Sequence, residues 1–95
     1  LKADSAEAWS EFAGALILLE DYPRALAALD KVRELKAEAA AHFFFRALAL
    51  DHLKQAQPAY ESYQKFLELS QGKSPNEEFK ARQRARILEK ELKKR

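Results

Sequence analysis

Apolar residues along this chain recur at steps of three and four, the spacing that places side chains on one face of an α-helix. The first stripe predicts a helix over about residues 5 to 19 and consists of Trp9, Phe12, Ala13, Leu16 and Leu19. Asp4 and Ser5 offer capping oxygens at its start. Pro23 suits the first turn of a second helix, because its φ is fixed and it has no N–H. That helix would bury Ala25, Leu29, Val32 and Leu35.

The same spacing returns 34 residues later. The corresponding pairs are Trp9 and Phe43, Ala13 and Ala47, Leu16 and Leu50, Leu19 and Leu53, Ala25 and Ala59, Leu29 and Tyr63, and Val32 and Phe66. The second copy predicts a helix over about residues 39 to 53 and another that opens at Pro58 and ends near Ser70. A period of this size indicates a repeated unit of two helices.

A fifth helix is predicted over about residues 75 to 93. Gly72 can supply the left-handed residue that closes the preceding helix. Ser74, Pro75 and Glu77 form a start signal, with Ser as the cap, Pro at the first helical position and Glu closing a capping box. A single narrow apolar stripe would cover the open side of the second copy, and it consists of Ala81, Ala85, Leu88 and Leu92.

The boundary between the two copies carries the weakest signal. Neither Gly nor Pro occurs between Ala25 and Leu53, and the linker at residues 36 to 39 consists of good helix formers. A straight helix through this linker would expose both apolar stripes, so burial favours a bend. The alternative is a domain-swapped dimer in which the second and third helices are fused.

The repeated unit resembles the tetratricopeptide repeat family, whose 34-residue unit carries Trp, Leu, Gly, Tyr, Ala, Phe and Ala in that order. The resemblance implies an all-α fold of two antiparallel helix-turn-helix repeats, residues 5–36 and 39–70, and a C-terminal capping helix over residues 74–95. It further implies one domain wound as a right-handed α-α superhelix, similar to the C-terminal repeats of a bacterial-type protein of this family.

The resemblance also sets expectations for single residues. Ala25 would be small so that the two helices of a repeat can cross closely. The family usually has Pro where this chain has Ala37, and it prefers Leu where this chain has Arg46. We expect the guanidinium of Arg46 to extend to water, as long cationic side chains at a packing edge commonly do.

The composition is that of a soluble helical protein, with 47% hydrophobic and 34% charged residues in a chain of 95. There is no Cys, so no disulfide framework is expected. No apolar run approaches the roughly 18 residues that cross a bilayer. The chain has no Met and begins at Leu1, so we expect a fragment or a processed form. The compartment stays open between cytoplasm and periplasm.

The resemblance implies that the first helix of each repeat lines a concave groove. The groove residues that we expect to bind a peptide are Glu11, Ile17, Phe44, Phe45, Leu48, Asp51 and His52. The run of Phe43, Phe44 and Phe45 cannot lie on one narrow helix face, since each residue turns by about 100°. Either Phe43 and one neighbour are core, or Phe44, Leu48 and Ile17 form an anchor pocket for a peptide.

The leading hypothesis is a scaffold-type protein interaction module that binds a peptide or protein partner of unknown identity. Some members of the family hold a peptide's terminal carboxylate with Lys, Arg and Asn, but the matching positions here include Glu7, Ser10, Gly14, Ala41 and Phe44. We therefore expect no such clamp.

An enzyme is not expected. His42 and His52 lack the spacing of a two-histidine metal site, and no nucleophile constellation is present. No catalytic residue, metal site or cofactor is predicted.

Charge is divided unevenly along the chain. Residues 1 to 72 hold 8 Lys and Arg against 11 Asp and Glu, whereas residues 73 to 95 hold 9 against 4. The basic face of the last helix would present Arg82, Arg86 and Lys90. Nucleic acid or an anionic surface is an alternative partner for this face, although Phe79 is its one aromatic residue and Glu89 and Glu91 interrupt the run. Self-association, for example as a homodimer, is a third hypothesis.

Overall fold

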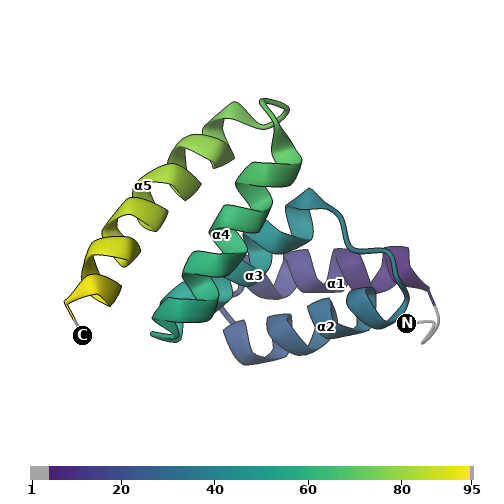
Figure 1. Ribbon diagram of the computed structural model, residues 1–95. Coiled ribbons are helices and arrows are strands. Elements are labelled where there is room, and N and C mark those ends of the chain that lie inside the picture. The colour runs from purple at the N-terminus through teal and green to yellow at the C-terminus, as the bar shows by residue number, and fades with distance from the viewer. Residues whose placement is uncertain (1–4, 95) are drawn as a thin grey trace.

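The computed structural model describes residues 5–94, which form five α-helices and no strand. The helices are α1 (Ala6–Leu18), α2 (Tyr22–Glu34), α3 (Ala40–His52), α4 (Ala56–Ser70) and α5 (Pro75–Lys93). Figure 1 shows α1 and α2 as one packed pair, α3 and α4 as a second, and α5 lying against α4. The predicted all-α fold is confirmed.

The helix boundaries follow the period of the sequence. The α3 helix begins 34 residues after α1, and α4 begins 34 residues after α2. Every predicted helix end lies within two residues of the observed one. Pro58 is the third residue of α4 and not its first, so the prediction that it opens the helix was wrong. The reason is that none of the first N–H groups of a helix has an intrahelical acceptor, and Pro therefore fits anywhere in the first turn.

The first three turns between helices are alike. Glu20, Lys36 and Lys54 adopt left-handed conformations with φ of 60°, 58° and 64°. The next residue in each turn donates its N–H back into the preceding helix, in the bonds Asp21 to Leu16, Ala37 to Val32, and Gln55 to Leu50. This is the hydrogen-bond pattern of a Schellman motif.

The turn at Lys36 determines the path of the linker between the two helix pairs. Residues 37–39 are not helical, so α2 and α3 are separate helices in this structure and the predicted bend is present. A left-handed conformation costs a residue other than Gly about 1 to 2 kcal/mol. Packing of α3 against both α1 and α2 offsets that cost.

Ion pairs also hold the linker. Arg46 reaches Asp30 at 3.0 Å and Glu38 at 3.8 Å, and its side chain is only 11% exposed. Glu38 in turn accepts hydrogen bonds from Nε of Arg33 at 3.0 and 3.1 Å. The expectation that Arg46 extends to water was wrong, because two carboxylates from α2 and the linker lie within its reach.

The turn into α5 differs from its prediction. Ser74 makes no side-chain capping bond, and Glu78 performs the role expected of Glu77. The carboxylate of Glu78 accepts from the backbone N–H groups of Gly72, at 2.8 Å, and Ser74, at 3.1 Å, and from the Ser70 hydroxyl. These hydrogen bonds hold the pKa of Glu78 below its ordinary value, and the bond from Ser70 has the largest effect. Glu78 takes this position because it lies on the inner face of α5, whereas Glu77 is exposed.

The interior contains two main clusters of buried residues. The first joins α1 to α2 and comprises Ala13, Leu16, Ala25, Ala28 and Leu29. The second joins α3, α4 and α5 and comprises Phe44, Ala47, Ala56, Ala59, Tyr63, Phe66, Ala81, Ala85 and Leu88. Phe45 packs against both clusters. Ala25 and Ala59 are 0% exposed, as expected for residues at close helix crossings.

Three leucines near helix ends are exposed, and two of them, Leu19 and Leu35, were predicted to be inward. Leu19 is 75% exposed, Leu35 is 37% exposed and Leu69 is 40% exposed. Each lies at the C-terminal end of its helix or directly after it. The stripe continues there in sequence, but the neighbouring helix no longer covers it.

Candidate functional site

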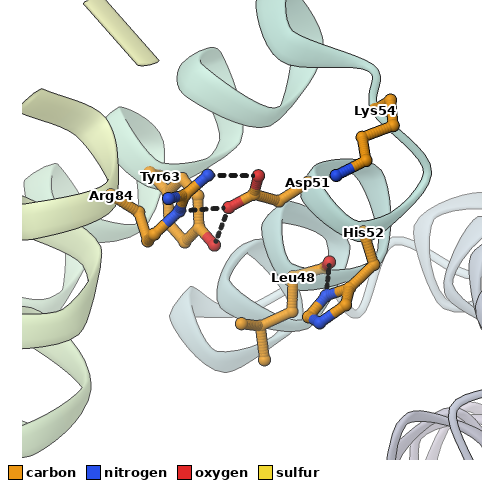
Figure 2. Close-up of a pocket in the computed structure, with 6 residues that line it drawn as sticks. All are labelled: Leu48, Asp51, His52, Lys54, Tyr63 and Arg84. Atoms are coloured by element: carbon orange, nitrogen blue, oxygen red, sulfur yellow. Dashed lines mark hydrogen bonds and ion pairs between the residues drawn. The ribbon is translucent and has the colours of Figure 1, made fainter. Parts of the chain in front are cut away.

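A row of hollows follows α3 on the side that faces α5. One hollow of about 320 Å³, drawn in Figure 2, is lined by Leu48, Asp51, His52, Lys54, Tyr63 and Arg84. Another, of about 230 Å³, is lined by Ala41, Phe44, Phe45, Phe66, Ser74 and Glu77. The lining residues of α3 are spaced by three and four, so they share one face of that helix. We call these two hollows the α3–α5 groove.

The floor of the larger hollow is an ion pair with a phenol beside it. Asp51 accepts from Arg84 through Nε at 2.7 Å and Nη2 at 2.8 Å, and from the Tyr63 hydroxyl at 3.0 Å (Figure 2). The three side chains come from α3, α5 and α4. A bidentate guanidinium pair fixes orientation as well as distance. This cluster therefore sets the position of α5 relative to α3.

The cluster has one favoured protonation state. Burial by itself would raise the pKa of Asp51, but the hydrogen bonds from Arg84 and Tyr63 outweigh it and the pKa is lowered. Burial and the neighbouring charge of Asp51 raise the pKa of Tyr63 far above its ordinary value. Asp51 is thus ionised and Tyr63 protonated at neutral pH. Asp51 lines the larger hollow, as expected of a groove residue, but both of its carboxylate oxygens are engaged by Arg84 and Tyr63.

The rim of the larger hollow is polar and cationic. His52 donates from Nδ1 to the carbonyl oxygen of Leu48 at 2.9 Å. Its ring stacks on Tyr22, with centroids 4.5 Å apart and planes inclined by 14°. Lys54 is exposed and forms no ion pair within residues 5–94. Leu48, half-buried, supplies the apolar wall.

The predicted aromatic anchor has a different place. Phe44 is 7% exposed and packs against Phe66 at 5.0 Å and Tyr63 at 6.4 Å between ring centroids. It is a core residue whose edge lines the smaller hollow, whereas Leu48 lines the larger one and Ile17 packs on the first cluster. The three residues of the predicted anchor pocket therefore do not line a single one of these two hollows. Phe43, predicted to be inward, is half-buried.

Two further predicted groove residues, Phe45 and Glu11, lie in different surroundings. Phe45 is half-buried, and a side-chain carbon on Gly14 would lie 4.0 Å from its ring. Phe45 therefore faces α1 and also lines the smaller hollow. Glu11 is exposed on α1 and lines neither hollow of the groove. The sequence did not predict Lys54, Tyr63 and Arg84 as groove residues, because whether these side chains come together depends on where α5 packs.

His42 connects the two helix pairs. Its Nδ1 accepts from the Ala39 N–H at 2.9 Å, so the ring proton is on Nε2, which lies 2.8 Å from Ser10 Oγ. Burial lowers the pKa of His42, which favours this neutral form. Across residues 5–94, no group of three or more His, Cys, Asp or Glu is placed to hold a metal ion.

The basic face of α5 lies away from the groove. Arg82, Arg86 and Lys90 are all exposed, and Arg82 reaches Glu78 at 4.0 Å. A shallow hollow of about 200 Å³ separates this face from α4 and is lined by Tyr60, Gln64, Leu67, Arg82, Ala85, Arg86 and Glu89. The arrangement presents cations to solvent beside a partly apolar surface.

Comparisons with protein-family models, with curated proteins and with solved structures found no match to this chain. In the part of the chain that the structure describes, no helix combines the length and the apolar character needed to cross a bilayer.

Proposed function

We propose that this chain is a protein interaction module of the tetratricopeptide repeat type, which binds a peptide segment of a partner along the α3–α5 groove. The observation that carries the proposal is the groove itself, which has an apolar wall at Leu48 and Phe45 and a polar rim at His52 and Lys54. Peptide sites on helical scaffolds combine apolar anchoring with a few placed polar groups.

The offset between the helix pairs supports the repeat assignment. The helices α1 and α3 begin 34 residues apart, as do α2 and α4, and α5 follows as a further helix that packs on α4 and is joined to α3 by the pair of Arg84 with Asp51. Repeats stacked with a small constant rotation wind into a superhelix whose first helices line one concave face. In that arrangement α1, α3 and α5 share the concave side.

The floor of the groove favours binding because it is already ordered. Arg84, Asp51 and Tyr63 hold one another without a ligand. A preformed site loses less conformational entropy when a peptide binds. The partner that fits best is a segment with an apolar side chain to place against Leu48 and an acceptor or carboxylate to place near Lys54.

A peptide library displayed on phage and selected against the 95-residue chain tests the proposal. Selected peptides should bind Leu48→Ala at least about tenfold more weakly than the unaltered protein, since a central contact contributes more than 1 kcal/mol. Lys54→Ala should cause a smaller loss. Arg86→Ala is the matched control, because Arg86 is exposed on a different face of α5.

Amide chemical shifts locate the site independently. On peptide addition, changes should concentrate along α3 and the facing side of α5. Equal affinity for the Leu48→Ala variant, or shift changes confined to other helices, would rule out the groove. Phe44 is not a useful position for this test, because its removal would damage the core.

A further inference from the structure

The two ends of the helix stack expose surfaces of opposite charge. Figure 1 places α1 at one end of the stack and α5 at the other. The exposed residues of α1 and the turn after it form the α1 end face, and they are Glu7, Glu11, Ala15, Leu18, Leu19 and Glu20. This set contains three carboxylates and no cation.

The α5 end face is basic. At about 100° per residue, the side of α5 opposite the buried stripe carries residues that the structure leaves exposed, namely Phe79, Lys80, Gln83, Arg86, Ile87 and Lys90. Every Glu of α5 lies outside this set. The α5 end face therefore contains three cations and no carboxylate.

Both end faces also expose large apolar side chains. Leu18 is 85% exposed and Leu19 is 75% exposed, while Phe79 is 57% exposed and Ile87 is 45% exposed. These are four of the six large hydrophobic residues exposed in the part of the chain that the structure describes. Apolar groups gathered on one face indicate an interaction surface more strongly than scattered ones.

The period of the chain shows how the α1 end face could be covered. The residues of α3 that lie 34 places after Glu11, Ala15 and Leu18 are Phe45, Ala49 and His52. In α3 these positions pack on the first helix pair: Phe45 contacts its cluster, Ala49 is 0% exposed and His52 stacks on Tyr22. Within residues 5–94, the corresponding residues of α1 are exposed and no helix packs on them.

We infer that the α5 end face of one copy of this chain docks on the α1 end face of a second copy. With the two helices antiparallel, the contact would place Lys90 opposite Glu7, Arg86 opposite Glu11 and Phe79 against Leu18, since each pair is the same distance along its helix. Ile87 would lie beside Arg86 in the same contact. The inference goes beyond the proposed peptide groove, which would stay open between α3 and α5.

The contact is head-to-tail because the charges exclude a symmetric one. Two α5 end faces would oppose cation to cation, and two α1 end faces would oppose carboxylate to carboxylate. A head-to-tail contact uses a different surface on each copy, so assembly continues into rings or open chains. Association driven partly by exposed charges weakens as salt screens them.

Sedimentation velocity over a series of protein concentrations tests the inference. At about 50 mM salt the weight-average mass should rise at least twofold with concentration, and at about 500 mM salt it should fall back toward one chain. A mass that stays at one chain up to about 1 mM protein, a weak affinity by any standard, overturns the proposal.

Two blocked variants separate a head-to-tail contact from a symmetric one. Glu11→Gln with Leu18→Gln blocks the α1 end face, and Arg86→Gln with Ile87→Gln blocks the α5 end face, and neither pair of neutral side chains gives the two blocked faces a new attraction for each other. All four side chains are exposed, so both variants should keep the helical content of the unaltered protein. Each variant alone should remain a single chain, and an equimolar mixture should double in mass and grow no further.

The other outcomes contradict the proposal. Association of either blocked variant alone would show a symmetric contact. A mixture that does not associate would show that these two faces do not meet. A labelled RNA or anionic vesicles binding the α5 end face of a chain that never self-associates would assign that face to a different partner.

Discussion

The two helix pairs share one spacing and have different interiors. The first cluster, between α1 and α2, consists of Ala and Leu residues alone. The second, among α3, α4 and α5, contains Phe44, Tyr63 and Phe66, and α5 is attached to it by the pair of Arg84 with Asp51. Aromatic side chains bury the most area per residue. A repeated pattern therefore predicts repeated geometry but not repeated stability.

The first helix pair depends on its contacts with α3. Three polar or aromatic contacts connect them: His42 with Ser10, Arg46 with Asp30, and His52 with Tyr22. In stacked helical units, stability is approximately the sum of each unit's own stability and that of its interfaces. We expect α1 and α2 to open before α3, α4 and α5, and amide hydrogen exchange to show lower protection in the first pair.

The largest expected effect is at the aromatic core. Phe66 is 2% exposed and Leu29 is 1% exposed, so both truncations leave cavities. Phe66→Ala should lower the free energy of unfolding by about 3 to 5 kcal/mol, and Leu29→Ala by about 2 to 5 kcal/mol. Urea denaturation measures both.

Hydrogen exchange then separates the two variants. Phe66→Ala should lower protection throughout the chain, whereas Leu29→Ala should lower it chiefly in α1 and α2. Ile87→Ala, at an exposed position, is the control and should change stability by less than about 0.5 kcal/mol. Equal loss of protection in α3 to α5 for the Leu29 variant would mean that the chain opens as one unit.

An intermediate effect is expected where α5 is attached. Arg84→Met removes the guanidinium and leaves the Asp51 carboxylate, 13% exposed, without its ion pair. The loss of hydrogen bonds to a charged group should cost about 1.5 to 3 kcal/mol. Arg82→Met is the control, because Arg82 is 55% exposed and its ion pair is 4.0 Å long, and it should cost less than about 1 kcal/mol.

The same variant should change the response to acid. The pKa of Asp51 is lowered in the folded protein, so its contribution to stability is present above the unfolded value of about 3.9 and is lost as pH falls through the folded value. Arg84→Met should flatten the part of the acid unfolding curve that Asp51 causes. An unchanged curve would show that the ion pair does not set this pKa.

The smallest effect is expected at the junction of the two pairs. The pKa of His42 is lowered in the folded protein, so the stability that neutral His42 provides is present above about pH 6.5 and is lost as pH falls through the folded value. Loss of one neutral hydrogen bond corresponds to about 0.5 to 1.5 kcal/mol. Urea midpoints at neutral and mildly acidic pH measure the difference.

His42→Asn should remove this pH dependence, and His52→Asn should leave it in place. Exchange protection in α1 and α2 should respond to mild acid before that of α4. If the His42 variant keeps the full pH dependence, the titrating group lies elsewhere in the chain.

Much of the helical layout could be predicted because its causes are local. The spacing of apolar residues, Pro23 and Pro75 near helix starts and Gly72 after a helix end placed all five helices within two residues. Ala25 and Ala59 were also expected to be buried. Five of the seven predicted groove residues line the two hollows, namely Phe44, Phe45, Leu48, Asp51 and His52, although Phe44 is mostly core and Asp51 is bound by Arg84. Glu11 lies on the α1 end face and Ile17 packs on the first cluster.

The amino-acid sequence by itself determined how many helices form, where they end and which are equivalent, since periodicity and capping act within a few residues. Tertiary structure alone decided that Phe44 is buried more deeply than Phe43, that Glu78 and not Glu77 closes the last turn, and that Lys36 is left-handed. The physical reason is that the sequence fixes only the angles between side chains on the same helix, at about 100° per residue. The rotation of the whole helix about its axis, which decides which of those side chains are buried, depends on how it packs against all of its neighbours.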